Sequence, residues 1–131
     1  MRQNRCAIAA LTTCALLIVS PALAADLGGE ITTAGTHAGL AAQASDIAGV
    51  HIHLHHVVNC LVGPGGAGFD SKELNPCANT GSGAIPDSGS PQTKQELEAA
   101  LAKANSGLAA TDMAAAQKDA SDTASMLKTV K

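Results

Sequence analysis

Four of the five histidines lie close together in the sequence, as His51, His53, His55 and His56. Imidazole nitrogen is the commonest metal ligand that proteins offer. In a helix, residues four apart are neighbours on adjacent turns, so His51 and His55 can direct two imidazoles at one ion. Zinc bonds histidine nitrogen at about 2.0 Å, a geometry that such a pair can provide. The spacing therefore predicts a metal site at His51 and His55.

The other histidines lie on different parts of the same predicted helix. At about 100° per residue, His53 and His56 are about 60° apart on the side opposite the first pair. They form a second candidate metal pair, one more exposed to water. His37 shares the face of His55 but lies about 27 Å away along a straight helix. It can join that site only if the helix folds back near Gly49.

Two histidines do not saturate a metal ion, so further ligands are needed. The candidates are Met113 and Met126 for copper(I), and Glu96, Glu98, Asp119 and Asp122 for harder ions. A divalent metal ion, copper or zinc, is the predicted cofactor. Histidines on a helix flank are also common as plain polar surface residues, and His51 could be a core histidine bonded to a carbonyl or carboxylate.

The first 24 residues have the features of a cleavable signal peptide. Arg2 and Arg5 precede an apolar run over residues 6–19, and Ala22-Leu23-Ala24 supplies the small-x-small cleavage pattern. The apolar run is shorter than the roughly 20 residues that span a bilayer. We expect cleavage after Ala24, a periplasmic or secreted destination, and no membrane insertion of the mature chain, residues 25–131.

The composition of the mature chain argues against several classes of partner. Six lysines stand against eleven acidic residues, a net charge of about −5 that disfavours nucleic acid and anionic membranes. Phe69 is the only residue of the Phe, Trp and Tyr type, so platforms for stacking bases are missing. Catalytic signatures such as His-Glu-x-x-His and Gly-x-Ser-x-Gly are absent from the sequence. A non-enzymatic protein is predicted.

Two of the four cysteines, Cys60 and Cys77, remain once the signal peptide is removed. In an oxidising compartment we expect them to form a disulfide. Closing this loop of about 17 residues would stabilise the fold by roughly 3 kcal/mol if the effect is entropic. The alternative is a pair of thiolates on a metal. A nucleophilic Cys60 beside His56 is excluded if the disulfide forms.

Apolar residues recur at helical spacing before a segment rich in glycine and proline. Residues 33–62 predict one helix, whose start could be capped by Thr32, Thr33 or Thr36 and which could bend or break near Gly49. Residues 63–90 predict a long loop, which a Cys60–Cys77 disulfide would tether.

The last part of the chain predicts a helical hairpin over residues 91–130. Ser90-Pro91 begins its first helix, and Thr111 or Asp112 caps the second. The whole mature chain is then a single all-α domain. We expect a small antiparallel three-helix bundle, or a short four-helix bundle if the first helix divides.

With its His-rich helix and Ala-rich hairpin, the chain resembles the small periplasmic His-rich helical metal-binding proteins of proteobacteria. Residues 51–56 and the hairpin from Glu96 to Leu127 carry the resemblance. It implies an exported helical bundle that sequesters copper or another divalent ion. Members of that group spread histidines through all their helices and lack a Cys60/Cys77 loop, so one or two sites at most are expected here.

Two other functions remain open from the sequence. A structural or interaction module of the cell envelope would use the tethered loop over residues 63–90 to contact a protein partner, with histidines setting the pH dependence. Non-covalent haem binding would use His and Met side chains between helices, although the scarcity of aromatic residues counts against it.

Overall fold

The computed structural model describes residues 24–131, and all regular structure in that range is helical. The helices are α1 (Leu27–Gln43), α2 (Ile47–Val62), α3 (Ala84–Asp87), α4 (Pro91–Ala109) and α5 (Met113–Thr129). The predicted all-α class is confirmed. The predicted signal peptide, apart from Ala24, falls outside the described residues. Within residues 24–131, no helix combines the length and hydropathy needed to cross a bilayer.

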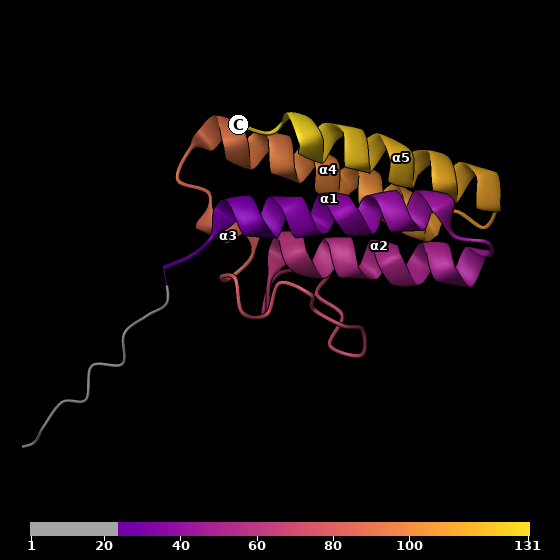
Figure 1. The fold of residues 1–131 in the computed structure, drawn as a ribbon, viewed down its shortest axis with the longest axis horizontal. Helices are drawn as coiled ribbons and strands as arrows, with labels where there is room; N and C mark the ends of the chain where they lie inside the picture. The colour runs from indigo at the N-terminus through magenta and orange to yellow at the C-terminus, as the bar shows by residue number, and fades with distance from the viewer. Residues whose placement is uncertain (1–23) are drawn as a thin grey trace, which may run out of the picture.

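Four long helices lie side by side, with the short α3 near one end of the bundle (Figure 1). Helix α1 packs against α2 and α5, and α4 packs against the other sides of the same two helices. The connections between α1 and α2 and between α4 and α5 span only residues 44–46 and 110–112. Such short connections make each pair an antiparallel hairpin.

The predicted helix over residues 33–62 is two helices in the structure, separated at residues 44–46. Ala44 and Asp46 both have extended backbone, and the Asp46 side chain accepts a hydrogen bond of 2.7 Å from the Gly49 N–H. This N-cap satisfies a free amide at the start of α2, so the second helix starts anew rather than continuing the first. The break therefore precedes Gly49 by three residues or more.

Capping side chains also begin the other long helices. Helix α1 starts at Leu27 with Asp26 as its cap, so the predicted threonine caps are wrong. Ser90 caps α4 with Pro91 in the first turn, and Asp112 caps α5, both as predicted. An N-cap oxygen of this kind typically contributes about 1 kcal/mol.

The core between the helices is made mainly of small residues. Helix α1 contributes Ala34, Ala38 and Ala41, whereas α2 contributes larger side chains such as Leu54 and Leu61. Leu40, an apolar residue of α1, is 44% exposed. Alanine stripes let helix backbones approach closely, and this brings α1 near enough to α2 for their polar side chains to meet.

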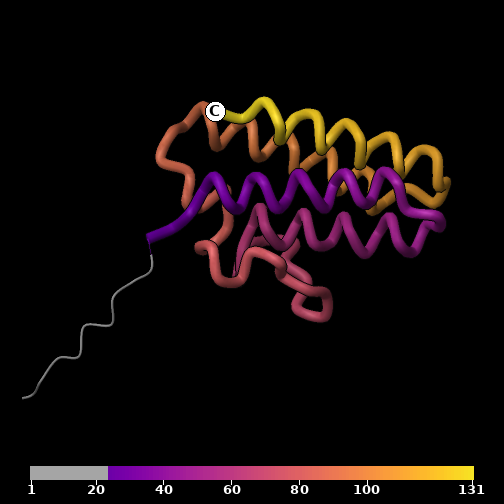
Figure 2. The backbone as a smooth tube through the Cα atoms, in the orientation of Figure 1, coloured from indigo at the N-terminus to yellow at the C-terminus, as the bar shows by residue number. Residues whose placement is uncertain are grey.

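The segment after α2 folds back along that helix before it reaches α3 (Figure 2). The Cys60–Cys77 disulfide, with its sulfurs 2.03 Å apart, ties it to the end of α2. Gly63 and Gly83 have φ values of 68° and 114°. A Cβ on Gly63 would collide with the backbone of Ser82, and a Cβ on Gly83 would collide with the backbone of Gly63. The loop thus closes against α2 through glycines that no other residue could replace without strain.

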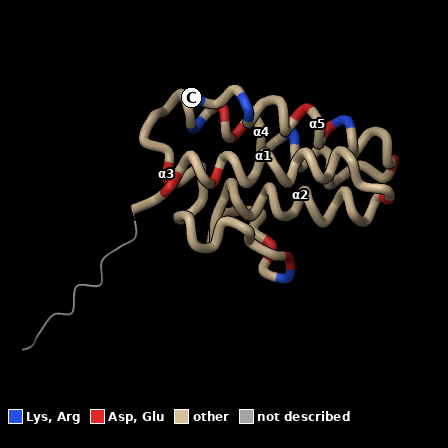
Figure 3. The backbone as a smooth tube through the Cα atoms, viewed as in Figure 1, with Lys and Arg blue, Asp and Glu red and all other residues tan. Residues whose placement is uncertain are grey.

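Charged residues occur mainly in α4 and α5 and in the loop near residues 70–73 (Figure 3). Helix α2 contains no Lys, Arg, Asp or Glu. Its polar side chains are four histidines and one asparagine, and these determine what chemistry the helix can carry.

Candidate metal centre

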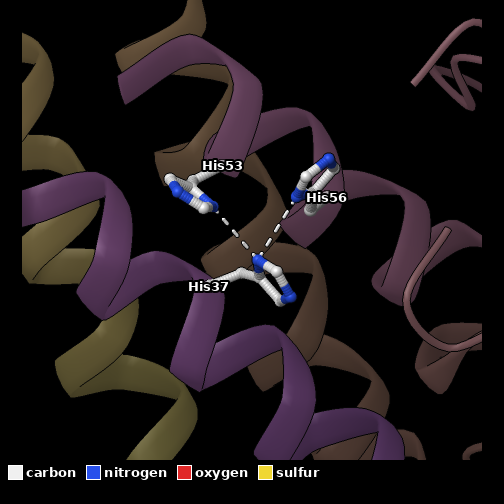
Figure 4. Close-up of side chains that lie close together, drawn as sticks. All are labelled: His37, His53 and His56. Carbon is white, nitrogen blue, oxygen red and sulfur yellow. Dashed lines mark hydrogen bonds between the residues drawn. The ribbon is translucent and has the colours of Figure 1, made fainter. Parts of the chain in front are cut away.

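Three histidines meet between α1 and α2 (Figure 4). His37 comes from α1, and His53 and His56 come from α2. The Nδ1 atom of His37 lies 3.2 Å from Nδ1 of His53 and 3.3 Å from Nδ1 of His56. One ligand nitrogen from each of the three rings lies within 4.8 Å of the other two. We call His37, His53 and His56 the histidine trio.

These separations match the spacing of ligands around a tetrahedral ion. Zinc binds histidine nitrogen at about 2.0 Å, so two nitrogens of a tetrahedral site are about 3.3 Å apart. Both contacts of His37 have this length. Each contact between two such nitrogens requires either a proton or a cation between them, because two lone pairs facing each other repel.

The rings do not form a parallel stack, and the planes of His37 and His53 are tilted by 37° to each other. The plane of His56 is nearly perpendicular to both other rings, at 89° to His37 and 84° to His53. His56 is the most buried of the three, with 8% of its surface exposed, whereas His37 and His53 are half-buried. The trio therefore lies between α1 and α2, partly buried but still accessible to water.

The surroundings favour the neutral form of two of these rings. Burial lowers the pKa of His37 below 6.5, and the neighbouring His56 and His53 lower it further. Burial likewise lowers the pKa of His56, and His53 adds to this while the Glu73 carboxylate opposes it. Only the neutral imidazole has a lone pair for a metal, so the site favours the form that binds.

The predicted pair His51 and His55 is not part of the trio. Nε2 of His51 lies 3.0 Å from the Ala110 carbonyl oxygen, which can only accept, so this nitrogen carries a proton. Nδ1 of His55 lies 3.7 Å from a carboxylate oxygen of Asp70. The two rings contact different partners, whereas His53 and His56, the second predicted pair, lie together in the trio.

The acidic ligands proposed from the sequence do not join the trio. Asp119 accepts hydrogen bonds from Ser106 and Lys103, and Asp122 pairs with Lys118. Among the described residues, the group of converging His, Cys, Asp and Glu ligand atoms contains none of Glu96, Glu98, Asp119 and Asp122. The third member of the group is instead His37, from the helix that precedes α2.

The sequence allows His37 to join a site on the second half of the predicted helix only if that helix folds back near Gly49, because a straight helix would hold it about 27 Å away. The chain reversal removes that distance: His37 and His53 each lie eight residues from Ser45, at the centre of the turn. In an antiparallel hairpin, residues equally far from the turn lie at the same level. The signal in the sequence was Asp46 followed three residues later by Gly49, an N-cap pattern inside the apparent helix.

Comparisons with protein-family models, curated proteins and solved structures found no significant match to this chain.

Proposed function

We propose that this protein binds one divalent metal ion or copper ion through His37, His53 and His56. The observation that carries the proposal is the pair of short contacts, 3.2 and 3.3 Å, that Nδ1 of His37 makes with the other two Nδ1 atoms. A neutral imidazole that only stabilised the fold would need one partner for that nitrogen. Three nitrogens directed at a common point are what a metal ion requires.

The chemistry of the donors limits the class of ion. Imidazole suits zinc, copper and nickel, whereas calcium and magnesium prefer oxygen ligands. Three imidazoles leave a fourth coordination position for water or an external ligand, since no further His, Cys, Asp or Glu converges there among the described residues. We assign the protein a binding role rather than a catalytic one, with copper or zinc as the ion.

The proposed setting is the periplasm or the exterior of the cell. Two features support it: the signal-peptide pattern over residues 1–24, and the Cys60–Cys77 disulfide, which forms in oxidising compartments. The resemblance to small periplasmic His-rich proteins agrees with this setting. The single trio favours tight capture of one ion over storage of many.

Titration of the purified protein with Zn(II), Cu(II) and Ni(II) by calorimetry tests the proposal. We expect one ion per chain, with affinity reduced at least about 100-fold in the double variant His37→Ala/His53→Ala, which loses two of three ligands. The matched control is His51→Ala/His55→Ala, which removes two histidines of the same segment outside the trio and should leave the affinity unchanged.

The titration can contradict the proposal in two ways. If the control loses binding while the trio variant retains it, the pair His51 and His55 is the site and the proposal is wrong. If the wild-type protein binds none of the three ions at micromolar concentration, metal binding is not its function.

A further inference from the structure

His56 faces the histidine trio with one ring nitrogen and an acidic loop residue with the other. Its Nδ1 lies 3.3 Å from His37, and its Nε2 lies 4.0 Å from a carboxylate oxygen of Glu73. Glu73 belongs to the loop after α2, outside any helix. The buried ring therefore connects the candidate metal position with a carboxylate on its far side.

Two attachments to α2 fix the position of Glu73. The first is the buried Asn59 side chain, which accepts a hydrogen bond of 2.8 Å from the Asp70 N–H. Its amide group donates to the carbonyl oxygens of Asp70 and Leu74, at 2.9 and 3.2 Å. Residues on both sides of Glu73 are thus bonded to an asparagine that lies three positions after His56 on the same helix.

The second attachment is the Cys60–Cys77 disulfide, which joins α2 to the loop four residues beyond Glu73. Together with Asn59 it encloses the segment 70–77 between two fixed points. The disulfide is therefore part of what holds a carboxylate behind His56.

A carboxylate in this position affects a metal-binding histidine in two ways. Within hydrogen-bond distance it can accept a hydrogen bond from Nε2–H, which fixes the tautomer whose Nδ1 lone pair is free, and it stabilises the positive charge that the ring gains on binding an ion. The present separation of 4.0 Å exceeds a hydrogen bond. The charge gained by the ring on metal binding would draw the Glu73 carboxylate closer.

We propose that Glu73 is a positioning residue for the histidine trio and that the Cys60–Cys77 disulfide acts on metal affinity through Glu73. This inference rests on the proposed function. It assigns the disulfide-tethered loop a role at the site, in addition to its role in stability.

Zinc affinity of the full chain, measured for Glu73→Gln against Asp70→Asn, tests the first part. Both changes remove one negative charge from the same loop, but Asp70 faces His55, which is outside the trio. We expect Glu73→Gln to weaken binding about 10- to 100-fold and Asp70→Asn to leave it nearly unchanged. Equal effects of the two variants would mean that only the overall charge matters and would overturn the assignment.

A spectroscopic measurement separates positioning from general damage to the fold. In the metal-free wild type, ¹⁵N chemical shifts of the His56 ring should report the tautomer protonated at Nε2. Glu73→Gln should shift this population toward the other tautomer, and Glu73→Asp should restore part of it. An unchanged His56 tautomer in Glu73→Gln would contradict the proposal even if affinity fell.

A double-mutant cycle tests whether the disulfide acts through Glu73. The variant Cys60→Ser/Cys77→Ser, first checked for helical content, should lose affinity by a factor similar to that of Glu73→Gln. Adding Glu73→Gln to it should then cost little more, because the carboxylate is already released. Fully additive losses would show that the disulfide acts independently. If the wild type binds zinc through the trio and none of these variants changes the affinity, the inference fails while the proposed function stands.

Discussion

Helix α1 contributes to two buried polar clusters of different construction. Glu30 and His37 lie seven residues apart, two turns of the same helix face. Glu30, which is 0% exposed, accepts a hydrogen bond of 2.9 Å at Oε1 from the Gly83 N–H. His37 meets only other imidazoles at its Nδ1 among the described residues. In the first cluster a carboxyl group is hydrogen-bonded to a backbone amide. In the second, ring nitrogens of three histidines lie close together.

The difference shows what each cluster is suited for. A buried carboxyl group bonded to a backbone amide holds the segment before α3 against α1, which is a structural role. Three lone-pair donors facing one another satisfy each other poorly without a proton or an ion, which is the property of a binding site. The predictions below test this contrast.

The largest expected effect is the stabilisation of the folded protein by zinc bound at the trio. With free zinc at about 100 times its dissociation constant, the free energy of unfolding should rise by about 2.7 kcal/mol, because the ion binds only the folded state. His37→Ala should abolish this increment, and Glu30→Gln should retain it. Urea unfolding with and without zinc measures both. An increment that survives in His37→Ala would place the ion elsewhere.

Removing the Glu30 side chain should cost stability in the metal-free protein. Glu30→Ala leaves the Gly83 N–H buried without its partner, and the expected loss is about 2 kcal/mol. The exposed Glu98 on α4 provides the control, since Glu98→Ala should change the unfolding free energy far less. A loss in Glu30→Ala no larger than in Glu98→Ala would refute the structural role given to Glu30. Urea denaturation of the two variants makes the comparison.

Ionisation of Glu30 should lower the free energy of unfolding as the pH rises. Burial raises the pKa of Glu30 above 4.5, the Gly83 N–H lowers it, and the nearby Asp87 and Asp26 carboxylates raise it further. The folded state then holds a proton that the unfolded state has lost, so stability falls as the pH rises from 4.5 through the folded pKa. Glu30→Gln, which cannot ionise, should reduce this decline. Equal slopes of unfolding free energy against pH for wild type and variant would contradict this role of Glu30.

The smallest expected effect comes from His37 and His56, and its sign is opposite to that of Glu30. The folded pKa values of His37 and His56 lie below 6.5, mainly because of burial, so the unfolded state binds more protons just below that pH. Stability contributed by these neutral rings should be lost as the pH falls from 6.5 through the folded values. Metal-free unfolding of wild type and His37→Gln/His56→Gln, followed against pH, measures the difference. If the loss of stability at low pH is unchanged in the variant, other groups cause it.

Much of the local structure follows from short stretches of sequence. Ser90-Pro91 and Asp112 mark the starts of α4 and α5, because a capping side chain and its amide target lie within three residues of each other. The Cys60–Cys77 disulfide follows from there being a single cysteine pair after residue 24. His53 and His56 were also a predicted pair, since three residues apart on a helix are neighbours.

The sequence by itself determined that histidines would gather on α2, because helical spacing alone sets which of them are neighbours. Only the tertiary structure decided which ones converge. The turn at residues 44–46 brings His37 across from His53. The carbonyl of Ala110, from the connection between α4 and α5, draws His51 away. Contacts between distant segments depend on where the chain reverses and which faces pack, and a change of a few residues in the turn changes every partner across the hairpin.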